Sequence, residues 1–557
     1  VLNTIWYKEE CTMMNTPLLL TSFMQYAARY FPTKEIVSVY ATGTFRYTYA
    51  DWYKRTCQLA GALQSLGIKK GDRVASFSLN NHRHMELYFG VPCMGAVLHT
   101  LNIRLSAENL VYIINHAGDR ILFIDEDVYF LLEPLKDQLK TIEKYVILSQ
   151  SGVMPQTTLS PVVLYDDLIK DFPETFDFPT DRDENEPCMI CYTSATTGDP
   201  KGVVYSHRGL VMHSFATGVT LGIQETDCAL HIVPMFHANA WGAPFACTMR
   251  GLKQVLPGRQ ILDMAMLCRI IAEEKVTFSC GVPTIWIMLH NYLESGGTHD
   301  FSSIRYLFSG GSAMPRHLIE SYEKKYSVLM AQGYGATETS PVVTLSLPKS
   351  YMDNMSVDEK IDVRATAGMP IPGLDVRLVS IETGKDVQMD GSEMGEILVR
   401  GPWIASEYYK DPGQTALSFR DGWFHTGDIG TMSKEGYISL VDRTKDLIKS
   451  AGEWISSIDL ENVIMGFSKV LEAAVISLPD DKWQERPLAC VVPQPDAADN
   501  ITQEEIQTYL KDKVAKWWIP DEIVFMKELP KTSVGKFDKK KLRETVIPDI
   551  LKKRGKK

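Results

Sequence analysis

The sequence lacks three features that would define common classes of protein. No apolar run approaches 18 residues, so no transmembrane helix is predicted. The beginning of the chain lacks the basic-then-apolar layout of a secretory signal, because Lys8, Glu9 and Glu10 follow soon after Trp6. The formal net charge of −11 provides no excess of positive charge for a nucleic-acid partner. Any anion site must therefore be locally positive, and we expect a cytoplasmic protein that does not bind nucleic acid.

Regularly spaced cysteines are also absent. The ten cysteines are scattered, which favours a reduced, cytoplasmic enzyme. The one Cys-x-x-Cys pair, Cys188 and Cys191, lies in the apolar run Pro-Cys-Met-Ile-Cys-Tyr. We interpret this run as a buried strand, and a redox or metal role for the pair is the alternative.

Length and patterning predict several domains of α/β type. A chain of 557 residues is too long for one ordinary core, and its 45% apolar and 23% charged residues are typical of a globular protein. Residues 72–79 and 120–125 are predicted to be buried strands, whereas residues 49–66 and 106–116 have the apolar spacing of helices. Strands that alternate with helices predict parallel sheets in a large N-terminal domain.

The later part of the chain changes character twice. Beyond Gly373, three short alternating segments predict a β-rich subdomain. The charged run at residues 442–446 is followed by a new α/β pattern, so we place a hinge there. The predicted organisation is an N-terminal domain over residues 1–442, a hinge over 443–447 and a small mobile α/β domain over 448–557.

The most informative stretch is residues 192–203, Tyr-Thr-Ser-Ala-Thr-Thr-Gly-Asp-Pro-Lys-Gly-Val. Its hydroxyl groups can donate hydrogen bonds to phosphate oxygens, its glycines let the backbone approach closely, and Lys201 adds a cation. The spacing is not that of a Walker motif, because Lys201 follows Gly198 by three residues and precedes a glycine. The stretch predicts a phosphate cradle, with a solvent-facing turn as the alternative.

Further motifs resemble the adenylate-forming superfamily of acyl-CoA synthetases, luciferases and adenylation domains over nearly the whole chain. Besides the loop they are Val-Pro-Met-Phe-His (233–237), Ser-Gly-Gly-Ser-Ala (309–313), Gln-Gly-Tyr-Gly-Ala-Thr-Glu-Thr-Ser-Pro (332–341), Gly-Glu-Ile-Leu-Val-Arg-Gly (395–401), Phe-His-Thr-Gly-Asp (424–428), Asp-Arg-Thr-Lys-Asp-Leu-Ile-Lys-Ser-Ala-Gly-Glu (442–453) and Pro-Lys-Thr-Ser-Val-Gly-Lys (530–536). Residues 234–241 and 452–461 most resemble the fatty acyl-CoA synthetase branch, which includes methylmercaptopropionate ligases.

The resemblance implies an AMP-forming ligase that joins a fatty or small hydrophobic acid to CoA through an acyl-adenylate. ATP, Mg²⁺ and CoA would be its cofactors and substrates, and fatty acyl relatives form homodimers. Two alternatives remain: a ligase that loads a carrier protein, and a catalytically silent nucleotide-binding regulator.

The resemblance also assigns the nucleotide site residue by residue. Binding of ATP and AMP is implied for Thr193, Ser194, Ala195, Thr196, Thr197, Gly198, Lys201, Gly311, Ser312, Ala313, Gly333, Tyr334, Gly335, Thr337, Asp428 and Arg443. Thr193 and Glu338 would hold Mg²⁺, Tyr334 would stack on adenine, and Asp428 would accept from the ribose hydroxyls. A helix cap at Thr337 and Glu338, and a turn role for Asp428, are the alternatives. Ala195 stands where the family usually has glycine, so weaker pyrophosphate handling is expected.

Catalysis is implied for Lys536, Thr337, Glu338 and His237. The alternative for Lys536 is ordinary surface charge, because it lies among Lys531, Lys539, Lys540 and Lys541. Lys445 would be the pivot of a rotation that presents a CoA-facing loop, Ser450, Ala451, Gly452, Glu453 and Trp454. Lys445 could otherwise belong to an exposed turn. His237, Trp241 and Gly311 would line the acyl pocket, and the spacing of His237 and Trp241 predicts that they share one helix face. Core packing is the alternative for this pair.

Overall fold

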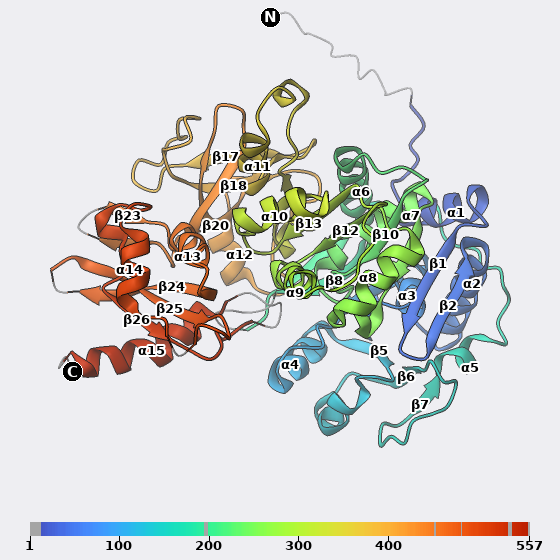
Figure 1. Ribbon diagram of the computed structural model, residues 1–557. Helices are drawn as coiled ribbons and strands as arrows, with labels where there is room; N and C mark the ends of the chain where they lie inside the picture. The colour runs from blue at the N-terminus through green and yellow to red at the C-terminus, as the bar shows by residue number, and fades with distance from the viewer. Residues whose placement is uncertain are drawn as a thin grey trace, which may run out of the picture.

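The computed structural model describes residues 13–193, 199–450, 453–480, 482–498, 500–532 and 537–554. A nine-stranded sheet forms one layer of the large N-terminal part (Figure 1). Its strands, in spatial order, are β16 (Met369–Pro370), β15 (Val342–Leu345), β14 (Leu329–Gly335), β13 (Tyr306–Gly310), β12 (Phe278–Gly281), β10 (Cys228–His231), β11 (Lys253–Leu256), β1 (Glu35–Tyr40) and β2 (Gly43–Thr48). The strands from β14 to β1 pair in parallel, and the outer strands pair antiparallel.

A seven-stranded sheet forms a second layer. Its order is β7 (Val162–Leu164), β6 (Lys144–Leu148), β5 (Asp119–Asp125), β3 (Arg73–Phe77), β4 (Val97–Thr100), β8 (Pro187–Tyr192) and β9 (Gly202–Ser206). All neighbours are parallel except β8 and β9. Strands β3 and β5 confirm the strands predicted near residues 72–79 and 120–125. Their apolar residues are buried, as expected for parallel strands covered on both faces.

Helices cover these sheets and also lie between them. Helix α2 (Tyr49–Ser65) and helix α4 (Ala107–Ala117) confirm the two predicted helices, and each begins at a side-chain cap, Thr48 or Ser106. Helix α3 (His82–Met94) is buried on nearly all sides because it contacts β1 of one sheet and β3, β4 and β8 of the other. The remaining helices of this part are α1 (Leu20–Tyr30), α5 (Tyr165–Ile169), α6 (His207–Leu221), α7 (Ala243–Arg250), α8 (Met264–Glu274), α9 (Pro283–Glu294), α10 (Arg316–Tyr326), α11 (Val357–Ala365) and α12 (Pro412–Ser418).

Cys188 and Cys191 lie in β8, where both are buried. The Cys188 thiol donates to the Tyr205 carbonyl at 3.3 Å, and the Cys191 thiol donates to Asn239 Oδ1 at 3.2 Å. Burial raises the pKa of the Cys191 thiol to about 11, so it stays protonated at neutral pH. The predicted buried strand is confirmed, and among the described residues no group of three or more His, Cys, Asp or Glu could hold a metal.

The predicted β-rich subdomain is confirmed as an antiparallel sheet. It contains β17 (Asp375–Val379), β18 (Gly395–Arg400), β20 (Trp423–Met432), β19 (Phe419–Arg420) and β21 (Ile438–Arg443). Strand β20 pairs with both β18 and β21, and this pairing places Asp428 opposite Arg443. The sheet therefore brings two of the predicted nucleotide-binding residues together.

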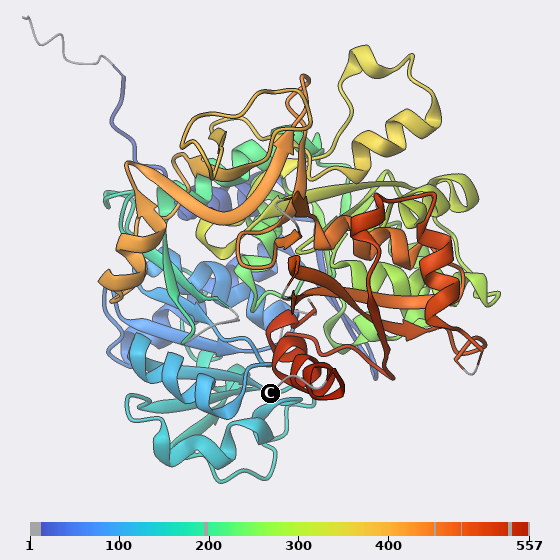
Figure 2. The ribbon, with the colours of Figure 1, turned by 90° about the vertical axis from the view of Figure 1, so that its left-hand side faces the viewer.

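The C-terminal part has its own sheet at one end of the molecule (Figures 1 and 2). Its elements are β22 (Ile448–Ser450), β23 (Glu453–Ile455), α13 (Ser457–Met465), β24 (Val470–Asp480), β25 (Gln484–Pro493), α14 (Gln503–Leu510), β26 (Glu522–Phe525) and α15 (Lys539–Lys553). Two apolar cores pack on this sheet, one with α13 and α14 and one with α15. The domain boundaries themselves stay a prediction.

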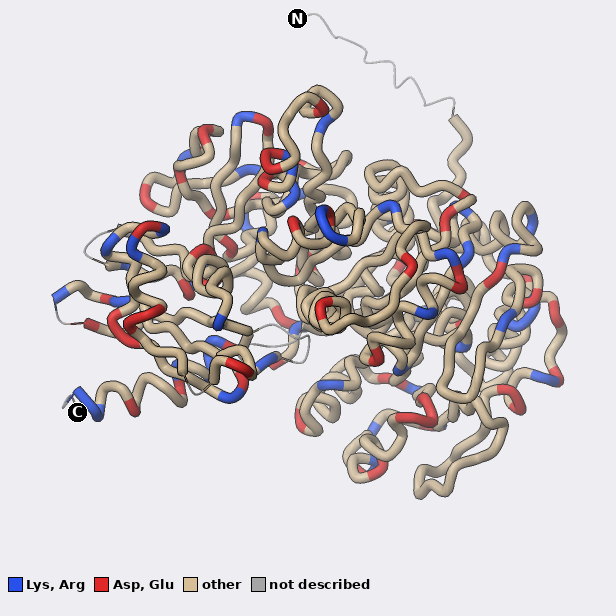
Figure 3. Tube along the Cα trace, viewed as in Figure 1, with Lys and Arg blue, Asp and Glu red and all other residues tan. Residues whose placement is uncertain are grey.

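Charge is distributed along the whole chain. Acidic and basic residues are mixed in every part of the trace that Figure 3 draws in colour. Among the described helices, none is long and apolar enough to cross a membrane.

Candidate functional site

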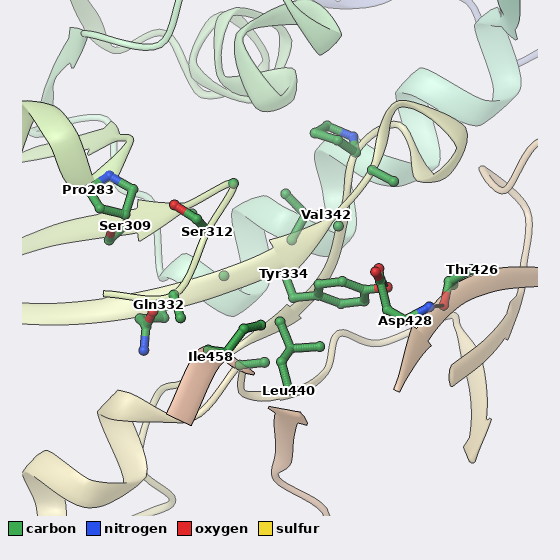
Figure 4. Close-up of a pocket in the computed structure, with 18 of the residues that line it drawn as sticks. Pro283, Ser309, Ser312, Gln332, Tyr334, Val342, Thr426, Asp428, Leu440 and Ile458 are labelled. Carbon is green, nitrogen blue, oxygen red and sulfur yellow. Dashed lines mark hydrogen bonds between the residues drawn. The ribbon is translucent and has the colours of Figure 1, made fainter. Parts of the chain in front are cut away.

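A cavity of about 880 Å³ lies where the N-terminal sheets, the β-rich subdomain and the C-terminal part meet. The predicted site residues that line it are Thr193, Lys201, His237, Trp241, Gly311, Ser312, Ala313, Gly333, Tyr334, Gly335, Thr337, Glu338, Asp428, Arg443 and Lys445. The C-terminal part adds α13 and α15 to the lining, for example through Ile458. Residues from distant motifs thus share one cavity (Figure 4).

Other predicted site residues are not in this lining or are not described. Ser194, Ala195, Thr196, Thr197, Gly198, Ala451, Gly452 and Lys536 lie outside the described residues. Ser450 is buried and accepts from Arg486 Nη1 at 3.2 Å, whereas Trp454 packs under the Lys449 ammonium at 4.6 Å. Glu453 begins β23. In this arrangement Ser450 and Trp454 do not line the cavity.

The polar part of the cavity is lined by Tyr334, Asp428, Arg443, Lys201 and Glu338. Its side chains link the N-terminal sheet to the β-rich subdomain. The Tyr334 hydroxyl, on β14, donates to Asp428 Oδ2 at 2.7 Å, and Figure 4 shows the two side chains pointing toward one another. Arg443 Nε lies 3.4 Å from Asp428 Oδ1. Burial, together with the Asp428 charge, holds the pKa of Tyr334 well above its usual range, so the phenol remains a donor. The Asp428 carboxylate is therefore fixed in place by groups from two sides.

The hairpin of β8 and β9 carries the phosphate-loop residues. The Thr193 N–H donates to the Lys201 carbonyl at 2.9 Å, and the Lys201 N–H donates to Thr193 Oγ1 at 3.1 Å. Lys201 Nζ lies 3.3 Å from the hydroxyl of Tyr408, which in turn donates to Glu338 Oε1 at 2.6 Å. Burial and the Glu338 charge raise the pKa of Tyr408, so its hydroxyl stays protonated. Tyr408 was not predicted, because no motif spacing relates it to Lys201 or Glu338.

Glu338 and Thr193 are chemically suited to Mg²⁺. Glu338 belongs to a 3₁₀ turn, η5 (Thr337–Thr339), and is only 8% exposed. Carboxylate and hydroxyl oxygens are hard ligands, and Mg²⁺ usually takes one or two of them and completes its shell with water and substrate phosphates. Glu338 and Thr193, which both line the cavity, would supply two such oxygens, and this number fits that mode of binding.

Glycines are required where backbone and rings crowd the cavity. A Cβ at Gly310 would come within 2.9 Å of Trp241 Cη2, and one at Gly335 would lie 1.7 Å from the Pro341 carbonyl oxygen. Gly311 has a φ of +84°, which a side chain would strain. The small-residue motifs therefore keep space open next to Trp241 and Tyr334.

The predicted helix face for His237 and Trp241 is wrong, although both residues line the cavity. His237 precedes the 3₁₀ segment η3 (Ala238–Gly242), in which Ala238, Asn239, Ala240 and Trp241 have φ values of 41°, 54°, 48° and 58°. This left-handed turn costs about 1–2 kcal/mol per non-glycine residue, so surrounding contacts must hold it. A hydrogen bond from Cys191 to the Asn239 side chain is one of them.

One part of the lining is apolar. Leu221, Ile223, Ala246, Cys247 and Phe278 belong to one packed cluster and line the cavity. The ring of Trp241 lies against Gly310 and lines the same cavity. The cavity can therefore hold an apolar chain beside a polar, anionic group.

Buried charges join β21 to the C-terminal part across the predicted hinge. The Ser457 N–H donates to Asp442 Oδ2 at 2.9 Å across the predicted hinge, and within the C-terminal part Lys539 Nζ lies 2.8 Å from Glu461 Oε1. Arg543 pairs with Asp446. Although burial disfavours its charged form, the nearby carboxylates of Glu461 and Asp442 raise the pKa of Lys539. The side chain of Lys539 is only 13% exposed, so this lysine near position 536 is a buried, paired residue.

Comparison with known proteins assigns the chain to a class of enzyme. Residues 24–409 match the family model of the AMP-binding enzyme, and residues 459–536 match that of the AMP-binding enzyme C-terminal domain. The chain belongs to this family of adenylate-forming enzymes.

Named relatives and a solved structure are similar over almost the whole length. A long-chain-fatty-acid–CoA ligase of Thermus thermophilus is 47% identical over 96% of both chains. A 3-methylmercaptopropionyl-CoA ligase of Ruegeria lacuscaerulensis is 38% identical over 96% of this chain and 98% of its own. The anthranilate CoA ligase AuaEII, solved in complex with anthranoyl-AMP, superposes with a TM-score of 0.83 at 25% identity, over 95% of this chain and 97% of its own.

Proposed function

We propose that this enzyme is an AMP-forming acid:CoA ligase that converts a fatty or small hydrophobic carboxylic acid to its CoA thioester through an acyl-adenylate. One observation carries the proposal: a single cavity is lined both by a carboxylate-and-cation site and by an apolar cluster, and Trp241 belongs to the same lining. An acyl-adenylate has the same division into a nucleotide and an apolar acyl group. The ligases named above, with their full-length similarity, support this reaction.

In the first half-reaction the acid's oxygen attacks the α-phosphorus of ATP and pyrophosphate leaves. Such a transfer depends mostly on positioning and charge neutralisation, so no protein nucleophile is needed. Asp428 would accept from the ribose hydroxyls, Tyr334 would stack on adenine, and Arg443 would contact the ribose or phosphate. Glycines and small residues at 311–313, 333 and 335 would surround the base.

The phosphates would be held by the loop from Thr193 to Lys201 and by Thr337. Thr193 and Glu338 would bind Mg²⁺, which neutralises phosphate charge when bound. Lys536 would bridge the acid's oxygen and the α-phosphate, and His237 would lie near the carboxylate. These roles match the motif positions, and the described residues among them line the cavity.

In the second half-reaction CoA attacks the acyl carbonyl and AMP leaves. We propose that the part from residue 448 onward rotates about Lys445, withdraws Lys536 and presents residues 450–454 to CoA. Lys445 lies between the two parts at the cavity, and burial lowers the pKa of its ammonium. Replacing Lys445 with proline would fix φ at the pivot, and should stop thioester formation while adenylation survives. Normal acyl-CoA formation by this variant would place the pivot elsewhere.

The assay that tests the function measures AMP release with CoA and a panel of acids from acetate to octadecanoate, including methylmercaptopropionate. We expect AMP and an acyl-CoA of matching mass. A product formed only with a carrier protein would favour carrier loading. Nucleotide binding without pyrophosphate release would favour a silent regulator. A cytoplasmic location and a homodimer complete the proposal, and light scattering would test the latter.

A further inference from the structure

Tyr408 lies between the two oppositely charged groups of the polar part. Its hydroxyl donates to Glu338 Oε1 at 2.6 Å and accepts from Lys201 Nζ at 3.3 Å. The same ammonium lies 4.4 Å from the centre of the Tyr408 ring. Within the described part of the chain, Lys201 and Glu338 form no direct ion pair, and the phenol is the group that links them.

The segment around Tyr408 is anchored to both sides of the site. The Tyr409 N–H donates to the Gly202 carbonyl at 2.8 Å, next to Lys201. The Ala405 N–H donates to the Glu338 carbonyl, also at 2.8 Å. The Tyr408 N–H donates to Thr415 Oγ1 at 2.9 Å, and the residue is only 3% exposed. The phenol therefore has little freedom to leave its position.

The neutral phenol of Tyr408 between Lys201 and Glu338 can prevent these two charged groups from forming an ion pair. An ammonium and a carboxylate that face each other in a partly buried cavity attract strongly, because the effective dielectric constant there is well below that of water. If they closed into an ion pair, both would have to be released before a magnesium-bound triphosphate could bind. The phenol satisfies one carboxylate oxygen and one ammonium hydrogen, and the described residues donate no hydrogen bond to Glu338 Oε2.

We propose that Tyr408 is a positioning residue for the nucleotide: it acts as a spacer that keeps Lys201 and Glu338 apart, so that each can receive its part of metal-bound ATP. This inference rests on the proposed function. It concerns a residue between β18 and α12, in a segment that is hydrogen-bonded to the start of β9.

The test removes the hydroxyl of Tyr408 but keeps its aromatic ring. The dissociation constant of Mn²⁺·ATP, with Mn²⁺ as the spectroscopic probe in the absence of acid, is measured by electron paramagnetic resonance for the wild type, Tyr408→Phe and Tyr409→Phe. We expect Tyr408→Phe to raise it roughly tenfold, in line with the loss of hydrogen bonds to charged groups. Tyr409→Phe keeps the backbone hydrogen bond to Gly202 and should leave the dissociation constant of Mn²⁺·ATP unchanged. Circular dichroism and thermal unfolding check that both variants are folded.

A second experiment tests the spacer role separately, by making the Tyr408→Phe change in a variant that lacks the Lys201 ammonium. In Lys201→Met no ammonium is present to close onto Glu338, so adding Tyr408→Phe should raise the dissociation constant no further. An undiminished tenfold penalty in that background would overturn the spacer role, and so would a Tyr408→Phe value equal to that of the wild type. A wild-type chain that makes no acyl-CoA would instead overturn the proposed function, which separates the two failures.

Discussion

The polar and apolar parts of the cavity position their key side chains by different means. Tyr334, Asp428 and Arg443 are fixed by a hydrogen bond and an ion pair between side chains from β14, β20 and β21. Trp241 is instead positioned by backbone conformation, at the end of a run of positive φ angles. Pairing of these side chains fixes the polar part in one geometry for its ligand. The strained turn that carries Trp241 can be altered without changing that geometry. Binding of nucleotide and selection of the acid should therefore be separable by mutation.

The largest effect is expected for the proposed catalytic lysine. Lys536→Ala should slow acyl-adenylate formation by at least about a hundredfold, because a cation that neutralises developing charge is lost. Thioester formation from pre-made acyl-adenylate should be nearly intact. Pyrophosphate release and acyl-CoA formation are the two measurements.

Lys541→Ala is the matched control for this prediction, since Lys541 is an exposed neighbour on α15 that does not line the cavity. It should behave as the wild type in both assays. An equal loss of both half-reactions in Lys536→Ala would reject a role confined to the first.

Next in size is the polar part itself. Asp428→Asn removes the charge that holds Arg443 and accepts from Tyr334, and we expect the KM for ATP to rise roughly tenfold or more. The long-acid to short-acid activity ratio should not change. Asp421→Asn, an exposed turn residue before the same strand, is the control. A changed acid ratio would show that the two parts are coupled.

A smaller effect is expected at the apolar part. Trp241→Ala should raise kcat/KM for long acids relative to short ones by roughly fourfold for each newly buried methylene, at about 0.8 kcal/mol each. The KM for ATP should stay constant. The control is Trp483→Ala, whose side chain is 40% exposed and lies in the C-terminal part. A lower melting temperature with an unchanged acid ratio would identify Trp241 as a packing residue.

The smallest effect tests the backbone of the turn. Glycine accepts the φ of +48° at Ala240 without strain, so Ala240→Gly should be neutral or slightly stabilising. Ala62→Gly, at a buried position in α2, should cost about 1 kcal/mol or more of unfolding free energy. Denaturant unfolding of both variants measures the difference. Equal destabilisation would argue against a left-handed turn.

The contrast also explains what sequence could and could not predict. Strands β3 and β5 and helices α2 and α4 follow from local apolar periodicity, which is enough to define an element. Several of the short motifs converge on the cavity, for example at the end of β14, in the turn η5 and within β20. The contacts of Tyr408 and Lys539 were not predicted because their partners are far away in the chain. The turn before Trp241 was predicted as a helix because spacing does not report the sign of φ.

The turn from Ala238 to Gly242 has a consequence for redesign. Its shape depends on residues outside it: Cys191 binds the Asn239 side chain, and His213 lies so close to Gly242 that a Cβ there would be 2.5 Å from its ring. To transfer acid preference between related enzymes, exchanging Trp241 alone would not be enough. The new enzyme would have the large indole ring but would lack the contacts that hold the turn in its left-handed conformation. The transferable unit is the five-residue turn together with Cys191 and His213, a discontinuous cassette drawn from β8, η3 and α6.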